Sequence, residues 1–326
     1  MQTSTFCGRE RLQLGAFPTP LQRLDNLSRE FGREVWVKRD DMSGVALGGN
    51  KVRKLEFLLH DALKNGYDCV ITTGGAQSNH AMITAACCNR LGLGAYLVLM
   101  GRGVTERRGN LLLNDLLGAQ VSFVDSDDFE VVYAAIDALA ERLRAAGKKP
   151  YIIPLGASVP LGALGYVSCV AEIAAQAQEA GLGVDHIVGC CGSCGTYAGL
   201  LVGALRYLPA ARVSGIIVGA VSGAEQIAAD MARDTAALAG IPFGAEQAAQ
   251  IRLFDYQGAG YAIPSPAGNR AIGKMAALEG LFLDPVYTGK TFAGLLDLHE
   301  QGYFAPGESI VFLHSGGAAT LFAIDF

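Results

Sequence analysis

The feature that most constrains this chain is a repeated alternation of short apolar runs with longer amphipathic stretches. An apolar run of about 4–8 residues predicts a buried strand, and an amphipathic stretch of about ten or more predicts a helix. Strands separated by helices pair in parallel, because each helix carries the chain back to the same edge. We therefore expect an α/β fold whose twisted, mostly parallel sheets are flanked by helices. The expected strands are residues 35–38, 69–72, 95–99, 120–124, 151–153, 186–190, 213–218 and 309–313, and the expected helices are residues 52–65, 79–91, 110–117, 129–146, 165–180, 196–205, 224–238, 269–279 and 292–301.

Several residues mark the expected helix ends. Asp128 stands just before an amphipathic stretch, where its side chain can cap the first turn. Gly92, Gly118, Gly147 and Gly181 follow such stretches, where a left-handed residue is favoured. Neither a linker nor a low-complexity tract divides the 326 residues, which are enough for two domains. A second domain must therefore arise by insertion or by the chain crossing back.

Charge and hydropathy argue against several classes of function. The net charge is −5 and no basic stripe with interleaved aromatic residues is present, so nucleic acid is not an expected partner. No apolar stretch reaches the roughly 18–20 residues of a membrane-spanning helix. The first residues lack the pattern of a secretory signal, so the eight cysteines are expected to be free thiols in the cytoplasm.

Lys51 follows two glycines and stands where a helix is expected to begin. The glycines would allow the backbone to approach a planar ligand closely. A lysine that forms a Schiff base must lose its proton, which burial, the neighbouring Arg53 and Lys54, and the helix N-terminus would all favour. The alternative is a surface lysine among other basic residues.

Two further segments join an expected strand to an expected helix, and such junctions offer free backbone N–H groups to an anion. Residues 72–80 end in Ser78, Asn79 and His80, which suit a carboxylate or phosphate but would equally suit an ordinary helix cap. Residues 190–199 are rich in small residues and lack the lysine of a nucleotide-binding P-loop.

The second of these segments also contains a C-x-x-C spacing at Cys191 and Cys194. Such a pair suggests a metal or redox site, but structural zinc normally needs four ligands. The other adjacent cysteines, Cys87 and Cys88, fall inside an expected helix. We therefore expect no metal, and small packed thiols that stay protonated, because a thiolate beside a phosphate would be repelled.

The C-terminal part places hydroxyl groups in or beside glycine-rich turns. They are Tyr261 in Asp-Tyr-Gln-Gly-Ala-Gly-Tyr, Tyr287 and Thr288 in Asp-Pro-Val-Tyr-Thr-Gly-Lys, and Ser315 in Leu-His-Ser-Gly-Gly. Taken singly, each is more typical of a turn or of the core than of a functional site.

Together and in this order, the segments resemble the D-cysteine desulfhydrase and 1-aminocyclopropane-1-carboxylate deaminase family over nearly the whole chain. The motifs that carry the resemblance are Gly-Gly-Asn-Lys, Gln-Ser-Asn-His, the Gly/Ser loop, Asp-Pro-Val-Tyr-Thr-Gly-Lys and His-Ser-Gly-Gly. The resemblance implies pyridoxal 5'-phosphate as cofactor, the fold shared with tryptophan synthase β, a small amino acid as substrate, and a homodimer. With it we expect a large cofactor-binding domain of residues 1–52 and 165–326, and a small domain of residues 53–164.

The resemblance also implies individual roles. Lys51 would hold the cofactor as a Schiff base and move protons, and Asn79 would touch the cofactor's 3'-oxygen. Ser315 would meet the ring nitrogen, while Tyr287 and Tyr261 would lie near the leaving group. The further implied cofactor contacts are Asn50, Lys54, Cys191, Gly192, Ser193, Cys194, Gly195 and Thr196, and the implied substrate contacts are Ser78 (also catalytic), Asn79, His80, Tyr261, Tyr287 and Thr288.

Three positions favour elimination over ring opening. A neutral hydroxyl at Ser315 leaves the ring nitrogen unprotonated, which suffices when a leaving group takes the electrons away. The deaminase branch carries glutamate where Thr288 stands and typically glutamine where His80 stands. The expected reaction is therefore α,β-elimination of D-cysteine to pyruvate, ammonia and hydrogen sulfide. The alternatives are the cyclopropane deaminase, a lyase for an analogue such as cysteate, a dehydrogenase (no dinucleotide fingerprint is present), and a non-catalytic cofactor-holding or amino-acid-sensing protein.

Overall fold

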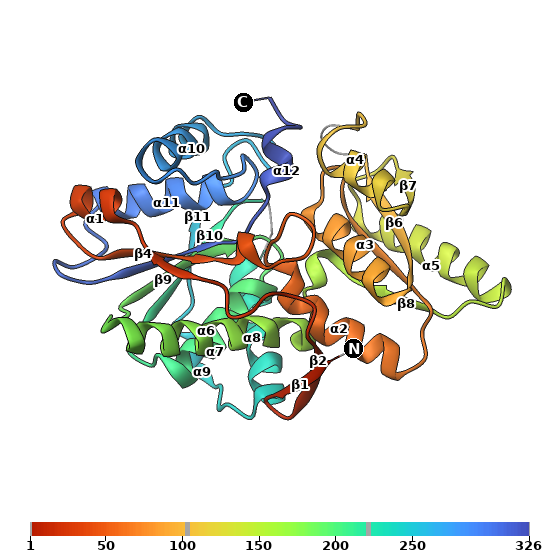
Figure 1. Ribbon diagram of the computed structural model, residues 1–326, viewed down its shortest axis with the longest axis horizontal. Coiled ribbons are helices and arrows are strands. Elements are labelled where there is room, and N and C mark those ends of the chain that lie inside the picture. Colours follow the sequence, from red (N-terminus) through yellow and green to blue (C-terminus); the bar gives the residue numbers. More distant parts are fainter. Residues whose placement is uncertain (1, 102–104, 220–222, 326) are drawn as a thin grey trace.

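The computed structural model describes residues 2–101, 105–219 and 223–325, which form two open sheets, one hairpin and the helices that cover them (Figure 1). The larger sheet has the order β11-β10-β9-β12-β4-β3, and the smaller has the order β7-β6-β5-β8. Every strand pair in the two sheets is parallel except β3 with β4, which confirms the expected fold class. The strands are β1 (Thr3–Phe6), β2 (Arg9–Leu12), β3 (Leu21–Arg23), β4 (Val35–Arg39), β5 (Cys69–Gly75), β6 (Gly94–Met100), β7 (Gln120–Val124), β8 (Pro150–Ile153), β9 (His186–Cys191), β10 (Arg212–Ile217), β11 (Arg252–Asp255) and β12 (Ile310–His314).

The helix ends follow the capping signals in the sequence. Asp128 accepts a hydrogen bond from the backbone N–H of Glu130 at 2.9 Å and caps α5. Gly92 and Gly181 are left-handed C-caps of α3 and α6. The helices are α1 (Asp25–Phe31), α2 (Lys51–Lys64), α3 (Asn79–Leu91), α4 (Gly109–Leu116), α5 (Phe129–Ala145), α6 (Pro160–Ala180), α7 (Gly195–Tyr207), α8 (Ala224–Ala239), α9 (Ala245–Ala248), α10 (Pro266–Glu279), α11 (Thr288–Glu300) and α12 (Ala318–Leu321).

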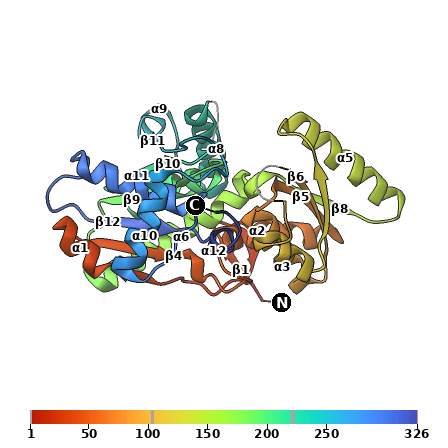
Figure 2. The same ribbon diagram turned by 90° about the horizontal axis from the view of Figure 1, so that it is seen from above.

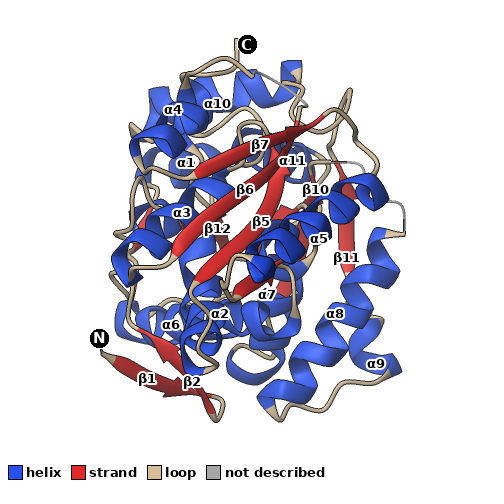
Figure 3. Ribbon diagram, turned by 90° about the vertical axis from the view of Figure 1, so that its right-hand side faces the viewer, coloured by secondary structure: helices blue, strands red, loops and turns tan. Residues whose placement is uncertain are grey.

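The smaller sheet buries both of its faces. Ile71 of β5 packs in one cluster with Val132 and Ile136 of α5, whereas the adjacent Val70 packs in another with residues of α2 and α3. This alternation follows from the two-residue period of a strand. Figure 3 shows α5 lying over this sheet. All four strands lie within residues 53–164, the segment that we propose as the small domain.

The larger sheet is covered in the same way. Val311 and Leu313 of β12 pack with residues of α6, α7 and α8, whereas Ile310 and Phe312 pack with residues of α1, α10 and α11. Figure 2 shows the two sheets in separate halves of the molecule. Helix α2 packs against α6 of one half and α3 of the other, so its first residue, Lys51, stands at the junction.

Among the described residues, no helix combines the length and the apolar character that a membrane crossing requires.

Candidate active site

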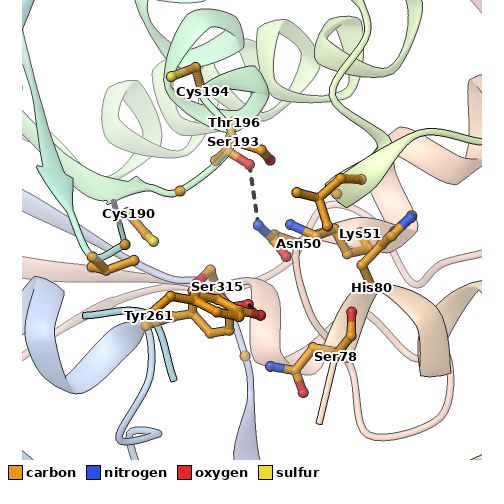
Figure 4. Close-up of a pocket in the computed structure, with 18 of the residues that line it drawn as sticks. Asn50, Lys51, Ser78, His80, Cys190, Ser193, Cys194, Thr196, Tyr261 and Ser315 are labelled. Carbon is orange, nitrogen blue, oxygen red and sulfur yellow. Dashed lines mark hydrogen bonds between the residues drawn. The ribbon is translucent and has the colours of Figure 1, made fainter. Parts of the chain in front are cut away.

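A cavity of about 580 Å³ lies where the carboxyl ends of strands from both sheets converge, at the beginning of α2 (Figure 4). Ligands of α/β proteins bind at such strand ends, next to helix N-termini. Figure 4 shows Ser193, Cys194 and Thr196 at the top of the view and Ser78 at the bottom, with Asn50 and Lys51 between them. The sequence-predicted residues that line the cavity are Asn50, Lys51, Ser78, Asn79, His80, Gly192, Ser193, Cys194, Thr196, Tyr261, Tyr287 and Ser315.

Lys51 has the properties of a reactive amine. Burial lowers its pKa from 10.5 to about 8, against a smaller opposing effect of Cys190. Arg53 does not contribute this shift, because its guanidinium is turned into ion pairs with Asp40 and Glu172, each at 2.8 Å. The expectation that Arg53 helps to deprotonate the lysine was therefore wrong, and burial is the cause.

The two glycines before Lys51 serve protein packing. Gly48 has φ +74°, and a Cβ placed there would lie 1.7 Å from a backbone carbonyl oxygen. A Cβ on Gly49 would lie 3.2 Å from the carbonyl oxygen of Ser315, and one on Gly316 would lie 2.7 Å from the Cα of Gly49. The N–H of Asn50 donates to the Ser315 carbonyl at 3.0 Å. These glycines therefore let the backbone before Lys51 pack against the backbone at Ser315 and Gly316. Backbone packing, and not space for a planar ligand, accounts for them.

The loop between β9 and α7, residues 192–194, presents donors to the cavity. Helix α7 begins at Gly195, and the first N–H groups of a helix have no partner within it. Asn50 donates its side-chain amide to Thr196 Oγ1 at 3.2 Å, the dashed line in Figure 4. Ser193 and Ser158 share a hydrogen bond of 2.6 Å between their hydroxyls. This set of N–H and O–H donors fits a phosphate group.

Lys54 lies behind this loop and outside the cavity lining. Its side chain is completely buried and donates to the carbonyl of Gly156 at 3.1 Å. A Cβ on Gly195 would lie 3.0 Å from its Nζ, which places the amine directly against the first residue of α7. Burial and the charge of Lys51 lower the pKa of Lys54 well below its ordinary value. A bound dianion would offset both effects, so the buried amine fits a phosphate in the loop.

The two cysteines of the loop segment are not equivalent. Cys191 is buried behind the cavity, whereas Cys194 lines it, and their Sγ atoms are 3.7 Å apart. The hydrogen bond between them raises the pKa of Cys191 and lowers the pKa of Cys194, which Lys54 lowers further. Cys194 is therefore the more acidic thiol. Among the described residues, no group of three or more histidine, cysteine or acidic side chains is placed to hold a metal ion.

The loop between β5 and α3 presents different groups. Ser78 caps α3, accepting from the N–H of Ala81 at 3.2 Å, and its own hydroxyl hydrogen stays available to the cavity. Asn79 accepts from the side-chain amide of Asn110 at 2.7 Å through Oδ1, so its NH₂ group is the part left to donate. The backbone N–H of Asn110 donates in turn to Gln77 Oε1 at 2.8 Å. Sequence reasoning missed Asn110, whose role depends on this tertiary contact.

His80 is held as a neutral ring. Burial, together with the charges of Lys51 and Lys54, lowers its pKa well below 6.5. Its Nε2 lies 2.8 Å from the hydroxyl of Thr72, and its Nδ1 lies 3.5 Å from that of Thr84. A substrate carboxylate would therefore meet a polar neutral group here, and the only cationic amine that lines the cavity among the described residues is Lys51.

Two tyrosines meet on another wall of the cavity. The hydroxyls of Tyr261 and Tyr287 are 2.7 Å apart, and their rings are edge-to-face with centroids 6.1 Å apart. Burial raises the pKa of Tyr287 well above 10, so it remains a protonated phenol. Lys290 donates to the carbonyls of Gln257 and Gly260, at 2.7 and 2.9 Å, and so fixes the turn that carries Tyr261. Lys290 belongs to the Asp-Pro-Val-Tyr-Thr-Gly-Lys motif, but the motif alone does not indicate this contact.

Thr288 does not reach the cavity. Its side chain is completely buried, and its hydroxyl donates to Asp284 Oδ1 at 2.7 Å. The same carboxylate accepts the backbone N–H groups of Val286 and Tyr287, each at 2.9 Å, and thereby sets the position of Tyr287. The expectation that Thr288 contacts substrate was wrong, because the helix start turns adjacent side chains in different directions. Asp284, which sequence reasoning missed, is the group that organises this turn.

The comparisons with known proteins agree with this geometry. A family model described as pyridoxal-phosphate dependent enzyme matches residues 12–316. A putative 1-aminocyclopropane-1-carboxylate deaminase of Pyrococcus abyssi is 42% identical over 313 residues, which cover 96% of this chain and 93% of the relative. A D-cysteine desulfhydrase of Salmonella newport is 44% identical over 319 residues, covering 96% and 95%. A crystal structure of an ACC deaminase homologue superimposes with a TM-score of 0.88 at 41% identity, covering 96% of this chain and 93% of that one.

Proposed function

Because this chain belongs to the pyridoxal-phosphate-dependent enzymes, we propose that it catalyses α,β-elimination on a small amino acid, with D-cysteine as the substrate. The products would be pyruvate, ammonia and hydrogen sulfide. In this proposal the β9–α7 loop and Lys54 hold the cofactor phosphate, Asn79 faces the 3'-oxygen, and Ser315 faces the ring nitrogen. When bound, pyridoxal phosphate supplies an electron sink for the charge that develops at Cα as its proton leaves.

Lys51 is the proposed attachment point and the proposed base. Its amine lines the cavity and makes no hydrogen bond or ion pair with any described residue. With a pKa of about 8, a usable fraction of the amine is unprotonated near neutral pH. Once free, the same Nζ would take the proton from Cα and hold it. The pKa of His80 lies well below 6.5, so its ring is a much weaker base than the Lys51 amine in this part of the cavity.

The β5–α3 loop is the proposed carboxylate site. Ser78 lies at the end of the cavity opposite the β9–α7 loop in Figure 4, and α3 begins at the next residue. A helix N-terminus favours a carboxylate through its unpaired donors and its dipole. Binding there would leave the amino-acid side chain free to extend toward the tyrosines.

The Tyr261–Tyr287 pair is the observation that most supports elimination as the reaction. Tyr287 is a protonated phenol inside the cavity, and its 2.7 Å hydrogen bond to Tyr261 gives it a second hydroxyl to share a proton with. Such a pair suits donation to a departing sulfur atom. Ring opening of a cyclopropane lacks a departing group and would need further acid–base help, but Thr288 is turned toward Asp284. The chain therefore fits elimination better.

Two alternative substrates also have specific support. The relative from Pyrococcus abyssi and the superimposed structure both bear deaminase names, so 1-aminocyclopropane-1-carboxylate is the second candidate substrate. Cysteate is a third, because the same elimination would release sulfite in place of sulfide. The homodimer and the cytoplasmic location that the resemblance implies also remain part of this proposal.

A substrate panel tests the proposal. Purified enzyme is supplied with D-cysteine, L-cysteine, cysteate and 1-aminocyclopropane-1-carboxylate, and pyruvate, sulfide, sulfite and 2-oxobutyrate are measured. We expect pyruvate and sulfide from D-cysteine to dominate. Dominant 2-oxobutyrate would show a deaminase, and dominant sulfite would show that the leaving group is wrong while the elimination stands.

A further inference from the structure

The two cysteines of the β9–α7 segment lie close enough to react with each other. Cys191 is the last residue of β9 and Cys194 immediately precedes α7, and their Sγ atoms are 3.7 Å apart. A disulfide needs about 2.05 Å between its sulfur atoms, so a local movement of under about 2 Å would bring them to bonding distance. Both thiols are free, and Cys191 already donates its S–H toward Cys194.

Cys194 has the surroundings of an attacking thiol. It is the N-cap of α7 with φ 61°, a left-handed conformation that a non-glycine residue adopts only when its neighbours hold it there. A helix N-terminus stabilises a thiolate, and so does the buried amine of Lys54 behind the loop. These effects agree with the lowered pKa of Cys194.

Access to this thiol runs through the cofactor cavity. Cys194 is only 1% exposed, but it lines the cavity, whereas Cys191 stands behind it. A phosphate held by the loop would lie between Cys194 and anything that enters. Cys194 is therefore the thiol that a reagent can reach, and Cys191 is the thiol that can resolve a mixed disulfide on it. A reagent would reach Cys194 through the cofactor site.

We propose that Cys191 and Cys194 form a redox-active dithiol that a low-molecular-weight disulfide oxidises in the cofactor-free protein, and that this protein disulfide and the cofactor exclude each other. The proposal rests on the proposed placement of the phosphate at the β9–α7 loop. It does not depend on which amino acid the enzyme uses.

The chemistry is an ordinary thiol–disulfide exchange. The Cys194 thiolate attacks one sulfur of the small disulfide, whose S–S bond breaks and releases one thiol after protonation. Cys191 then loses its proton and attacks Cys194 Sγ, which breaks the mixed disulfide and releases the second thiol. The protein pair loses two electrons and two protons, and the small disulfide gains them as two thiols.

The closed disulfide would change the loop that faces the phosphate. Ser193 lies between the two cysteines, and its hydroxyl is tied to Ser158 at 2.6 Å. Drawing Cys194 toward Cys191 would move the backbone N–H groups of residues 193–195 away from their present positions. We expect the oxidised protein to bind pyridoxal phosphate at least about tenfold more weakly, as the loss of a charge-assisted hydrogen bond would produce.

The test uses cofactor-free protein carrying Cys7→Ser, because Cys7 is the partly exposed cysteine and would react on its own. The protein is incubated with cystamine and analysed by intact mass and peptide mapping. We expect a mass loss of about 2 Da and one disulfide joining Cys191 to Cys194. Loading with pyridoxal phosphate beforehand should prevent it, and dithiothreitol should restore cofactor binding, followed by the absorbance of the bound cofactor.

Two matched variants test whether the disulfide depends on Cys191 specifically or on any nearby thiol. Cys190→Ser removes an adjacent cavity-lining thiol and should leave the disulfide intact, whereas Cys191→Ser should give only a mixed disulfide between Cys194 and cysteamine. The mass and the peptide map need no cofactor, so an absent disulfide refutes the dithiol. A disulfide that forms equally with and without cofactor, or leaves its affinity unchanged, refutes the coupling to the phosphate site.

Discussion

The β9–α7 and β5–α3 loops have the same backbone arrangement, but the side chains packed behind them differ in charge. Each follows a completely buried parallel strand and leads into a helix whose first turn contributes residues to the cavity lining. Behind the first lies the buried amine of Lys54, whereas the second is supported by the neutral side chains of Asn110 and His80. In the function proposed above, these side chains from elsewhere in the fold would make the first loop a firm site for a dianion and the second a weaker site suited to an exchanging carboxylate.

The largest expected effect concerns Lys51, which stands between the two loops. Because the neutral amine is the form that attacks the cofactor aldehyde, the rate of cofactor capture by cofactor-free enzyme should rise about tenfold per pH unit below the pKa. The pKa of about 8 therefore predicts a rise of about 50-fold between pH 6 and pH 8, and a plateau at about twice the pH 8 rate above about pH 9. Stopped-flow absorbance measures this rate. A rate still climbing steeply at pH 10 would show that burial does not lower this pKa.

Lys54→Met removes the cation behind the β9–α7 loop while nearly keeping the volume. We expect cofactor affinity to fall roughly 10- to 100-fold, because a buried positive charge behind the phosphate loop is lost, while the substrate KM measured at saturating cofactor stays unchanged. Lys64→Met, at an exposed position of the same helix, is the matched control. Equal affinities in both variants would remove the difference between the two loops.

Ser78→Ala tests the opposite loop. We expect the substrate KM to rise about tenfold, with cofactor affinity nearly unchanged, because a donor to the carboxylate is lost. The variant also loses a helix cap, which costs about 1 kcal/mol of stability. Ser265→Ala removes a similar cap from α10, away from the cavity lining, and controls for that loss. If Ser78→Ala weakened the cofactor and spared KM, the two anion sites would have to be exchanged.

Asn110→Ala should have the smallest effect. It frees Asn79 Oδ1, so the Asn79 amide is no longer fixed with its NH₂ group toward the cavity. We expect about threefold weaker cofactor binding and a shifted cofactor absorption band, as for the loss of one neutral hydrogen bond. Asn114→Ala, one turn further along the same buried helix face, serves as the control. A spectrum identical to that of the unaltered enzyme would mean that Asn110 does not orient Asn79.

The central fold could be predicted because its strands are apolar and its helices amphipathic. All eight expected strands are present, and α3 spans the expected residues. The hairpin of β1 and β2 was missed, because its side chains are mostly polar and largely exposed. Helix α11 begins four residues earlier than expected, at Thr288, because the Asp284 carboxylate satisfies its first N–H groups.

The cavity residues could be predicted where a motif places a side chain directly on a loop, as for Lys51, Ser78 and Ser193. Residues that act through another group could not be predicted, since their partners are distant in sequence. Asn110 lies 31 residues from Asn79, and Lys290 lies 30 residues from Gly260. Thr288 was misplaced for a related reason, because adjacency to Tyr287 in sequence says nothing about which way its side chain points.

In the proposed function Lys51, and not the more deeply buried Lys54, carries the cofactor between the two loops. The most direct measurement is borohydride reduction of the holoenzyme, followed by proteolysis and tandem mass spectrometry of the labelled peptide. We expect one phosphopyridoxyl group per chain, located on Lys51, because Lys51 lines the cavity while Lys54 donates to the Gly156 carbonyl. A label on Lys54, or no label on this helix, would contradict it.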